Sequence, residues 1–110
     1  MNKIFKYTLP VKEKFTLELP CNAQIVRVED VEGKFFLWAI VNTEEGYPTE
    51  TRYIECYKTG QPIETPLPDL VFLGTCKLFI MMELCLYMFE NVNPSGMTIN
   101  NSTMTDGGLA

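Results

Sequence analysis

Apolar and polar residues alternate along much of the chain, and a period of two predicts β-strands. The clearest case is Phe15 to Leu19, where Thr16 and Glu18 separate the apolar residues and Pro20 ends the segment. With turn residues between them, about seven such segments predict an all-β fold, either a compact antiparallel sandwich or an open barrel. The segments are Lys3 to Leu9, Phe15 to Leu19, Ala23 to Val31, Lys34 to Asn42, Thr51 to Lys58, Leu70 to Cys76 and Met82 to Phe89.

The segment from Lys34 to Asn42 is apolar on both faces. Phe36, Trp38 and Ile40 occupy one face, and four further apolar residues occupy the other. A strand of this kind lies at the centre of a sheet, or has one face covered by a partner.

The longest apolar block runs from Leu78 to Phe89 and is interrupted only by Glu83. Leucine and methionine also favour helices, so a helix over this block is the alternative to a strand. The all-β context favours the strand. A hairpin turn then falls near Leu78 to Met82, and its apolar residues protrude as an interaction site. The other possibility is that this tip folds back onto the core.

Two stretches have no strand pattern. Lys58 to Asp69 contains three prolines and a glycine, which predict a long ordered loop that is neither strand nor helix. From Asn91 onward the chain lacks lysine, arginine and aromatic residues, and its asparagine, serine, threonine and glycine predict a mobile tail. The expected organisation is one β domain over residues 1–90 and a polar C-terminal tail over 91–110.

The charge balance limits the class of partner. The net charge of −5 argues against direct nucleic-acid binding, which rests on lysine and arginine. The first fourteen residues are an exception, because Lys3, Lys6, Lys12 and Lys14 against Glu13 give them +3. Lysines of this kind either keep an edge strand from unwanted pairing or form a docking strip for an acidic partner.

Catalytic chemistry has little support. The chain has no histidine, and its four cysteines are widely spaced without a CxxC motif. We therefore expect free thiols, no metal site, no cofactor and no enzymatic activity. The charged opening segment lacks the apolar core of a signal peptide, and no membrane association is expected.

A set of short motifs resembles a family of small bacteriophage proteins of unknown function, over about residues 3 to 90. The chain departs from that family at Gln61, where the family usually has histidine, and at Lys58, where it often has glycine. The resemblance implies a phage-encoded accessory protein in the cytoplasm of the host bacterium, and it implies no known activity. The motifs are the KYTL of Lys6 to Leu9, the LPCNA of Leu19 to Ala23, the LWAIVN of Leu37 to Asn42, the KTGQPI of Lys58 to Ile63, the FLGT of Phe72 to Thr75 and the LYMFE of Leu86 to Glu90.

The first functional hypothesis is a non-enzymatic binder that inhibits a host protein, with defence proteins among the candidates, and that also self-associates. Apolar anchors within a charged rim are usual at interfaces. The expected contact residues are Leu78, Phe79, Ile80 and Met81 at the apolar tip, with Glu44, Glu45 and Glu50 in and beside a predicted acidic loop over Thr43 to Pro48.

An alternative is an oligomer that sequesters a small anionic ligand such as a nucleotide signal, and a third hypothesis is a virion or assembly component. In the ligand-binding hypothesis, cations and backbone amides hold the anion while tyrosines stack on a base. The candidate residues are Arg52, Tyr53, Tyr57, Lys58, Thr59, Gly60 and Gln61.

Overall fold

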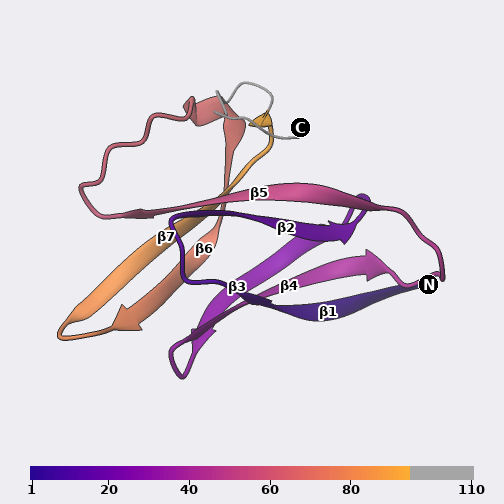
Figure 1. Cartoon of the computed structure of the whole chain (residues 1–110), viewed down its shortest axis with the longest axis horizontal. Coiled ribbons are helices and arrows are strands. Elements are labelled where there is room, and N and C mark those ends of the chain that lie inside the picture. The colour runs from indigo at the N-terminus through magenta and orange to yellow at the C-terminus, as the bar shows by residue number, and fades with distance from the viewer. Residues whose placement is uncertain (95–110) are drawn as a thin grey trace.

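The protein is a two-layer antiparallel β sandwich in the computed structural model, which describes residues 1–94 (Figure 1). The predicted polar tail therefore lies almost wholly outside the described residues. The strands are β1 (Asn2–Leu9), β2 (Lys14–Pro20), β3 (Gln24–Val31), β4 (Lys34–Asn42), β5 (Thr49–Lys58), β6 (Leu70–Phe79) and β7 (Glu83–Asn91). The predicted all-β sandwich is confirmed.

The strands form a three-stranded sheet in the order β1-β4-β3 and a four-stranded sheet in the order β2-β5-β7-β6. Neighbours in both sheets are antiparallel. The central position predicted for β4 is confirmed, because it pairs with β1 on one side and β3 on the other. Its outward face, which carries Phe36, Trp38 and Ile40, is half-buried rather than covered by a third layer.

The core lies between the two sheets, where alternate residues of each central strand meet. Phe35, Leu37 and Val41 of β4 are buried, as are Ile54 of β5 and Met88 of β7. Burial of each such side chain contributes about 1.5–3 kcal/mol.

The apolar block is two strands and a turn, so a helix over Leu78 to Phe89 is wrong. Strand β6 continues to Phe79 and β7 begins at Glu83, and both strands are longer than the alternation alone predicts. The prediction that the preceding loop contains no helix also needs correction. Leu67–Asp69 forms one short 3₁₀ turn, because Pro68 suits the first positions of a helical turn. Within residues 1–94, no helix is long and apolar enough to span a membrane.

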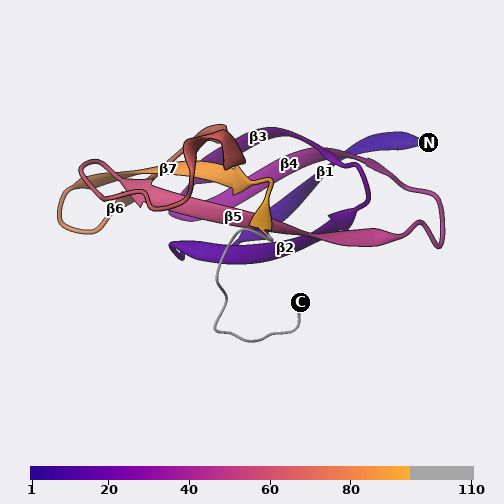
Figure 2. The same cartoon turned by 90° about the horizontal axis from the view of Figure 1, so that it is seen from above.

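The molecule is elongated, with extents of 44 × 33 × 22 Å. The β6–β7 turn lies at one end of the longest axis, and the β4–β5 loop lies at the other end (Figures 1 and 2). At one side of the sandwich β3 packs against β6, where the backbone N–H of Lys77 donates to Asp30 Oδ1 at 2.7 Å. This contact holds together two strands that belong to different sheets.

Candidate functional site

The β6–β7 turn exposes four consecutive large apolar side chains. Phe79 is 69% exposed, Ile80 76%, Met81 96% and Met82 77%. Leu78, the remaining predicted tip residue, is half-buried against the core and supports the turn rather than forming its surface. The apolar tip, defined here as residues 79–82, protrudes as predicted and does not fold back.

A small apolar groove of about 150 Å³ lies at the base of this hairpin. Leu78, Leu84 and Leu86 line it from the hairpin, and Val11 lines it from the β1–β2 loop. Lys12, Glu13 and Lys58 also line it, so its charged residues are of both signs. The sequence pattern did not reveal this groove, because Val11 is far from the hairpin in the chain.

The acidic residues predicted to accompany the tip lie elsewhere. Glu44 and Glu45 are in the β4–β5 loop, at the opposite end of the long axis (Figure 1). Glu50 lies near the start of β5, where its carboxylate accepts the backbone N–H of Asn22 at 2.9 Å. The tip and the acidic residues therefore do not form one contact surface.

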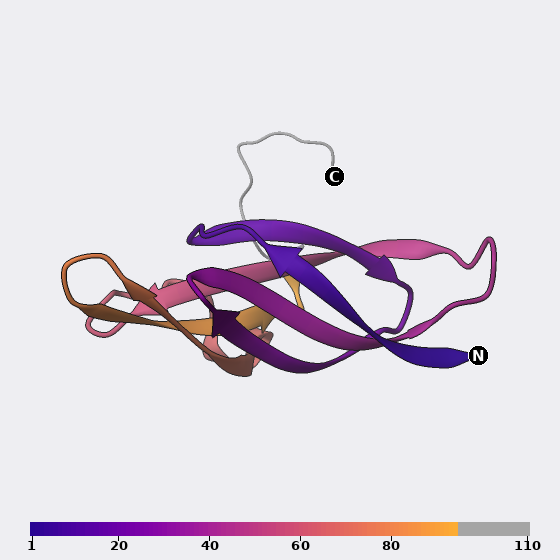
Figure 3. The same cartoon turned by 90° about the horizontal axis from the view of Figure 1, so that it is seen from below.

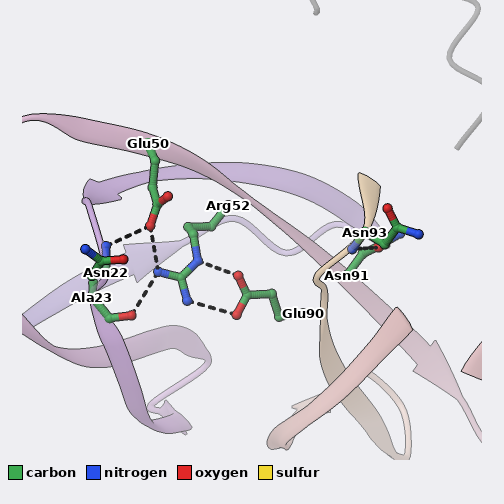
Figure 4. Close-up of polar contacts among 7 residues, drawn as sticks. All are labelled: Asn22, Ala23, Glu50, Arg52, Glu90, Asn91 and Asn93. Atoms are coloured by element: carbon green, nitrogen blue, oxygen red, sulfur yellow. Dashed lines mark hydrogen bonds and ion pairs between the residues drawn. The ribbon is translucent and has the colours of Figure 1, made fainter. Parts of the chain in front are cut away.

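Arg52 is the centre of a polar network between the sheets (Figure 4). Its Nε and Nη2 both donate to the carboxylate of Glu90, the latter at 3.0 Å. Its Nη1 donates to the carbonyl oxygen of Ala23 at 2.9 Å and lies 3.6 Å from Glu50. The hydrogen bond to Glu90 is the main reason that the pKa of Arg52 is raised above its ordinary value.

This network fixes the turn that carries the chain from β2 to β3. The N–H of Ala23 donates to the carbonyl of Pro20 at 3.1 Å, and Asn22 has a φ of 63°, which asparagine tolerates better than most residues. Because its guanidinium is engaged on three sides, Arg52 is a structural residue and has no free face with which to clamp an anion.

A second polar cluster, which no sequence pattern predicted, surrounds Glu55. This residue is 1% exposed, and Tyr57 and Thr65 both donate to its Oε1 while Asn91 donates to its Oε2. Thr65 belongs to the long loop between β5 and β6, so the carboxylate fastens that loop to the sheet. Tyr57 is 5% exposed and contacts Phe89 edge-on, which places it within the structure rather than on a ligand surface.

The ionisation of this cluster follows from its surroundings. Burial acts to raise the pKa of the Glu55 carboxyl, but hydrogen bonds from Tyr57, Asn91 and Thr65, aided by the charge of Lys14, lower it below its ordinary value. Burial and the hydrogen bond to Glu55 raise the pKa of Tyr57 to about 12. Glu55 is therefore a buried carboxylate stabilised by hydrogen bonds.

Replacing Glu55 by glutamine is expected to lower the free energy of unfolding by about 1–3 kcal/mol at neutral pH, because one of the three donors loses its acceptor. A carboxyl with a lowered native pKa stabilises the fold above its unfolded-state pKa, and this contribution disappears as the pH falls through the native value. The difference between E55Q and the wild type should therefore shrink in acid. Urea unfolding at about pH 7 and about pH 3 measures it. An equal loss of stability in E55Q at both pH values would contradict an ionised Glu55. Glu45→Gln is the control, because Glu45 is exposed.

The remaining predicted ligand residues form a tight turn. Gly60 has a φ of 86°, and the N–H of Gln61 donates to the carbonyl of Lys58 at 3.1 Å. The Gln61 side chain closes the same turn by accepting the N–H of Lys58 at 2.9 Å. Lys58 through Gln61 line an open hollow of about 720 Å³ together with residues 83–85 of β7. Tyr57 does not reach it. Arg52 and Tyr53 line a different, smaller hollow, which they share with the carboxylates of Glu50 and Glu90.

The potential metal ligands and the cysteines are dispersed over the described part of the chain. Residues 1–94 contain no cluster of three potential metal ligands. All four cysteines are free, and two of them are buried in the core. Burial raises the pKa of Cys56 to about 11 and that of Cys76 to about 12, so both thiols are protonated and unreactive at neutral pH.

These features define a small two-sheet β sandwich with an apolar hairpin tip at one end and two internal polar networks. The chain belongs to the family described as Domain of unknown function (DUF7352), whose model matches residues 1–97. A search of curated proteins found no match, and a search of solved structures found none either.

Proposed function

We propose that this protein acts by binding another protein through the β6–β7 tip, without catalysis. The observation that carries the proposal is the exposure of four consecutive large apolar residues at the end of the β6–β7 hairpin. Exposed apolar patches on small proteins mark interaction sites, and methionine adapts readily to different partner surfaces.

The surroundings of the tip support the same function. The groove lined by Leu78, Leu84 and Val11 continues the apolar surface toward the core. Lys77 and Glu83 flank the turn and form an exposed ion pair at 3.4 Å, which supplies a polar rim. We expect a partner with an apolar pocket for the tip, and the resemblance to phage proteins suggests that this partner is a protein of the host bacterium.

Sequestration of a small anion has less support. The hypothesis relied on Arg52 and Tyr57, and both are engaged in internal hydrogen bonds. Lys58 and its turn remain beside an open hollow, but the same hollow also contains Glu83, whose charge opposes an anion.

The double substitution Ile80→Asp and Met81→Asp tests the proposed contact. Because both side chains are exposed, the free energy of unfolding should change by no more than about 0.5 kcal/mol. Affinity purification from bacterial lysate should recover a partner with the wild type, and purified partner should bind the variant at least about tenfold more weakly. Leu67→Asp is the matched control, since Leu67 is 71% exposed and lies outside the tip.

Three results would contradict the proposal. They are undiminished binding by the tip variant, equal loss with Leu67→Asp, and no recovered partner with the wild type. Solution mass measured in parallel on all three proteins would show whether the tip binds a second copy of the chain instead.

A further inference from the structure

Strand β1 has one open edge. It pairs with β4 along its whole length, from Asn2↔Asn42 to Leu9↔Phe35, and with no second strand among residues 1–94. It leads to the N-terminus at the end of the molecule opposite the apolar tip (Figures 1 and 3). Ile4 is 61% exposed and Phe5 44%.

The register shows which backbone groups face that open edge. The N–H of Thr43 donates to the carbonyl of Met1 at 2.9 Å, which makes these two residues a directly hydrogen-bonded pair. In an antiparallel ladder such pairs alternate with pairs that direct their N–H and C=O groups away from each other. The backbone N–H and C=O groups of Ile4, Lys6 and Thr8 therefore point toward the open edge, where they can hydrogen-bond an added strand.

The charges along this edge are positive and lack carboxylate partners. Lys3 and Lys6 form no ion pair with any described carboxylate. The Nζ of Lys6 instead lies 4.1 Å from the ring centroid of Phe36, on the outward face of the sheet. The first fourteen residues carry +3 (four lysines against Glu13) in a chain whose net charge is −5.

We propose that the open edge of β1 binds an extended acidic segment of a partner protein, which adds to the three-stranded sheet as a fourth strand. Carboxylates of that segment lie beside Lys6 on the outward face, and its apolar residues lie beside Phe5 and Tyr7 on the inward face. Charge complementarity selects this occupant, because the edge is basic and its ammonium groups are unpaired.

Two other occupants fit less well. A second copy would bring the lysines of both β1 strands together, and like charges across neighbouring strands are destabilising. A stacked nucleobase would need a free ring face. Arg27 lies 4.4 Å from the Trp38 ring centroid, and Lys6 lies over both Trp38 and Phe36.

The probe is a capped eight-residue peptide in which glutamate and valine alternate, compared with its lysine–valine counterpart. Calorimetry should show at least about tenfold tighter binding of the glutamate peptide, and added salt should weaken it. Trp38 is the single tryptophan and neighbours Lys6, so its fluorescence should change on binding. Amide hydrogen exchange at Ile4 and Lys6 should slow.

Three variants separate the contribution of the backbone hydrogen bonds from that of the charge. Ile4→Pro removes only an outward N–H, which edge strands tolerate, and should reduce affinity at least about tenfold. Ile4→Thr keeps that N–H and should bind within about twofold of the wild type. Lys6→Glu leaves the ladder intact and should bind the glutamate peptide at least about fivefold more weakly.

The proposal fails if the two peptides bind equally or if neither binds. It also fails if Ile4→Pro and Ile4→Thr behave alike while both remain folded by circular dichroism. A doubled solution mass that Ile4→Pro reduces to that of a monomer would show that a second copy occupies the edge, and this too would overturn the acidic-segment proposal.

Discussion

Replacement of Arg52 by methionine is expected to lower the free energy of unfolding by about 3–5 kcal/mol, because it leaves a buried carboxylate without its partner. Glu90 is 8% exposed, and both of its oxygens accept hydrogen bonds from Arg52. The carbonyl of Ala23 loses its donor in the same step, so the β2–β3 turn is released as well. Urea denaturation with the tryptophan signal measures the effect.

The double variant Arg52→Met with Glu90→Leu is the decisive control. Removing both charges eliminates the uncompensated carboxylate. The double variant should therefore recover most of the free energy of unfolding lost by R52M alone. If R52M costs less than about 1 kcal/mol, the range of an exposed ion pair, the network does not fasten the sandwich as described.

Gly74→Ala is expected to destabilise the fold by about 2–4 kcal/mol through overpacking and backbone strain. Gly74 has a φ of 148°, and an added Cβ would lie 2.6 Å from Cγ2 of Val28 on β3. It also lies beside the point between Phe72 and Gly74 where the β6–β7 register shifts. Thermal and urea unfolding should both show the loss.

Gly46→Ala separates the two causes of that loss. Its φ of 78° imposes strain of its own, but an added Cβ meets nothing within 4 Å. We expect it to cost only about 1–2 kcal/mol. A loss from Gly74→Ala no larger than that from Gly46→Ala would mean that β3 and β6 separate easily, against the close packing found between them.

The sequence predicted the strands well because their signal is local. Alternation within Phe15 to Leu19 and the two apolar faces of β4 depend only on neighbouring residues. The turn between β6 and β7 was also predictable, since strands on both flanks of Leu78 to Met82 require the chain to reverse there. The ends of β6 and β7 were not, because cross-strand pairing extended both strands into residues without alternation.

The polar networks were not predictable from one sequence. Glu55 and Asn91 are 36 residues apart, and Arg52 and Glu90 are 38 apart, so no local pattern relates them. Arg52 and Tyr57 looked like ligand residues because a cation near tyrosines can serve either role. The sheet order, which places β7 beside β5, shows that the main partner of Arg52 is Glu90. Tyr57 faces inward on β5, where its hydroxyl donates to Glu55 of the same strand.

The position of β7 also determines when the fold can form. It is the last described strand in the chain, yet it lies inside its sheet and separates β5 from β6. These two strands do not pair with each other, so the four-stranded layer stays in two pieces until β7 inserts. The four-stranded sheet therefore cannot be completed before residues up to about Asn91 have been synthesised. A chain truncated before Glu83 would leave the edges of β5 and β6 that pair with β7 exposed and prone to aggregation.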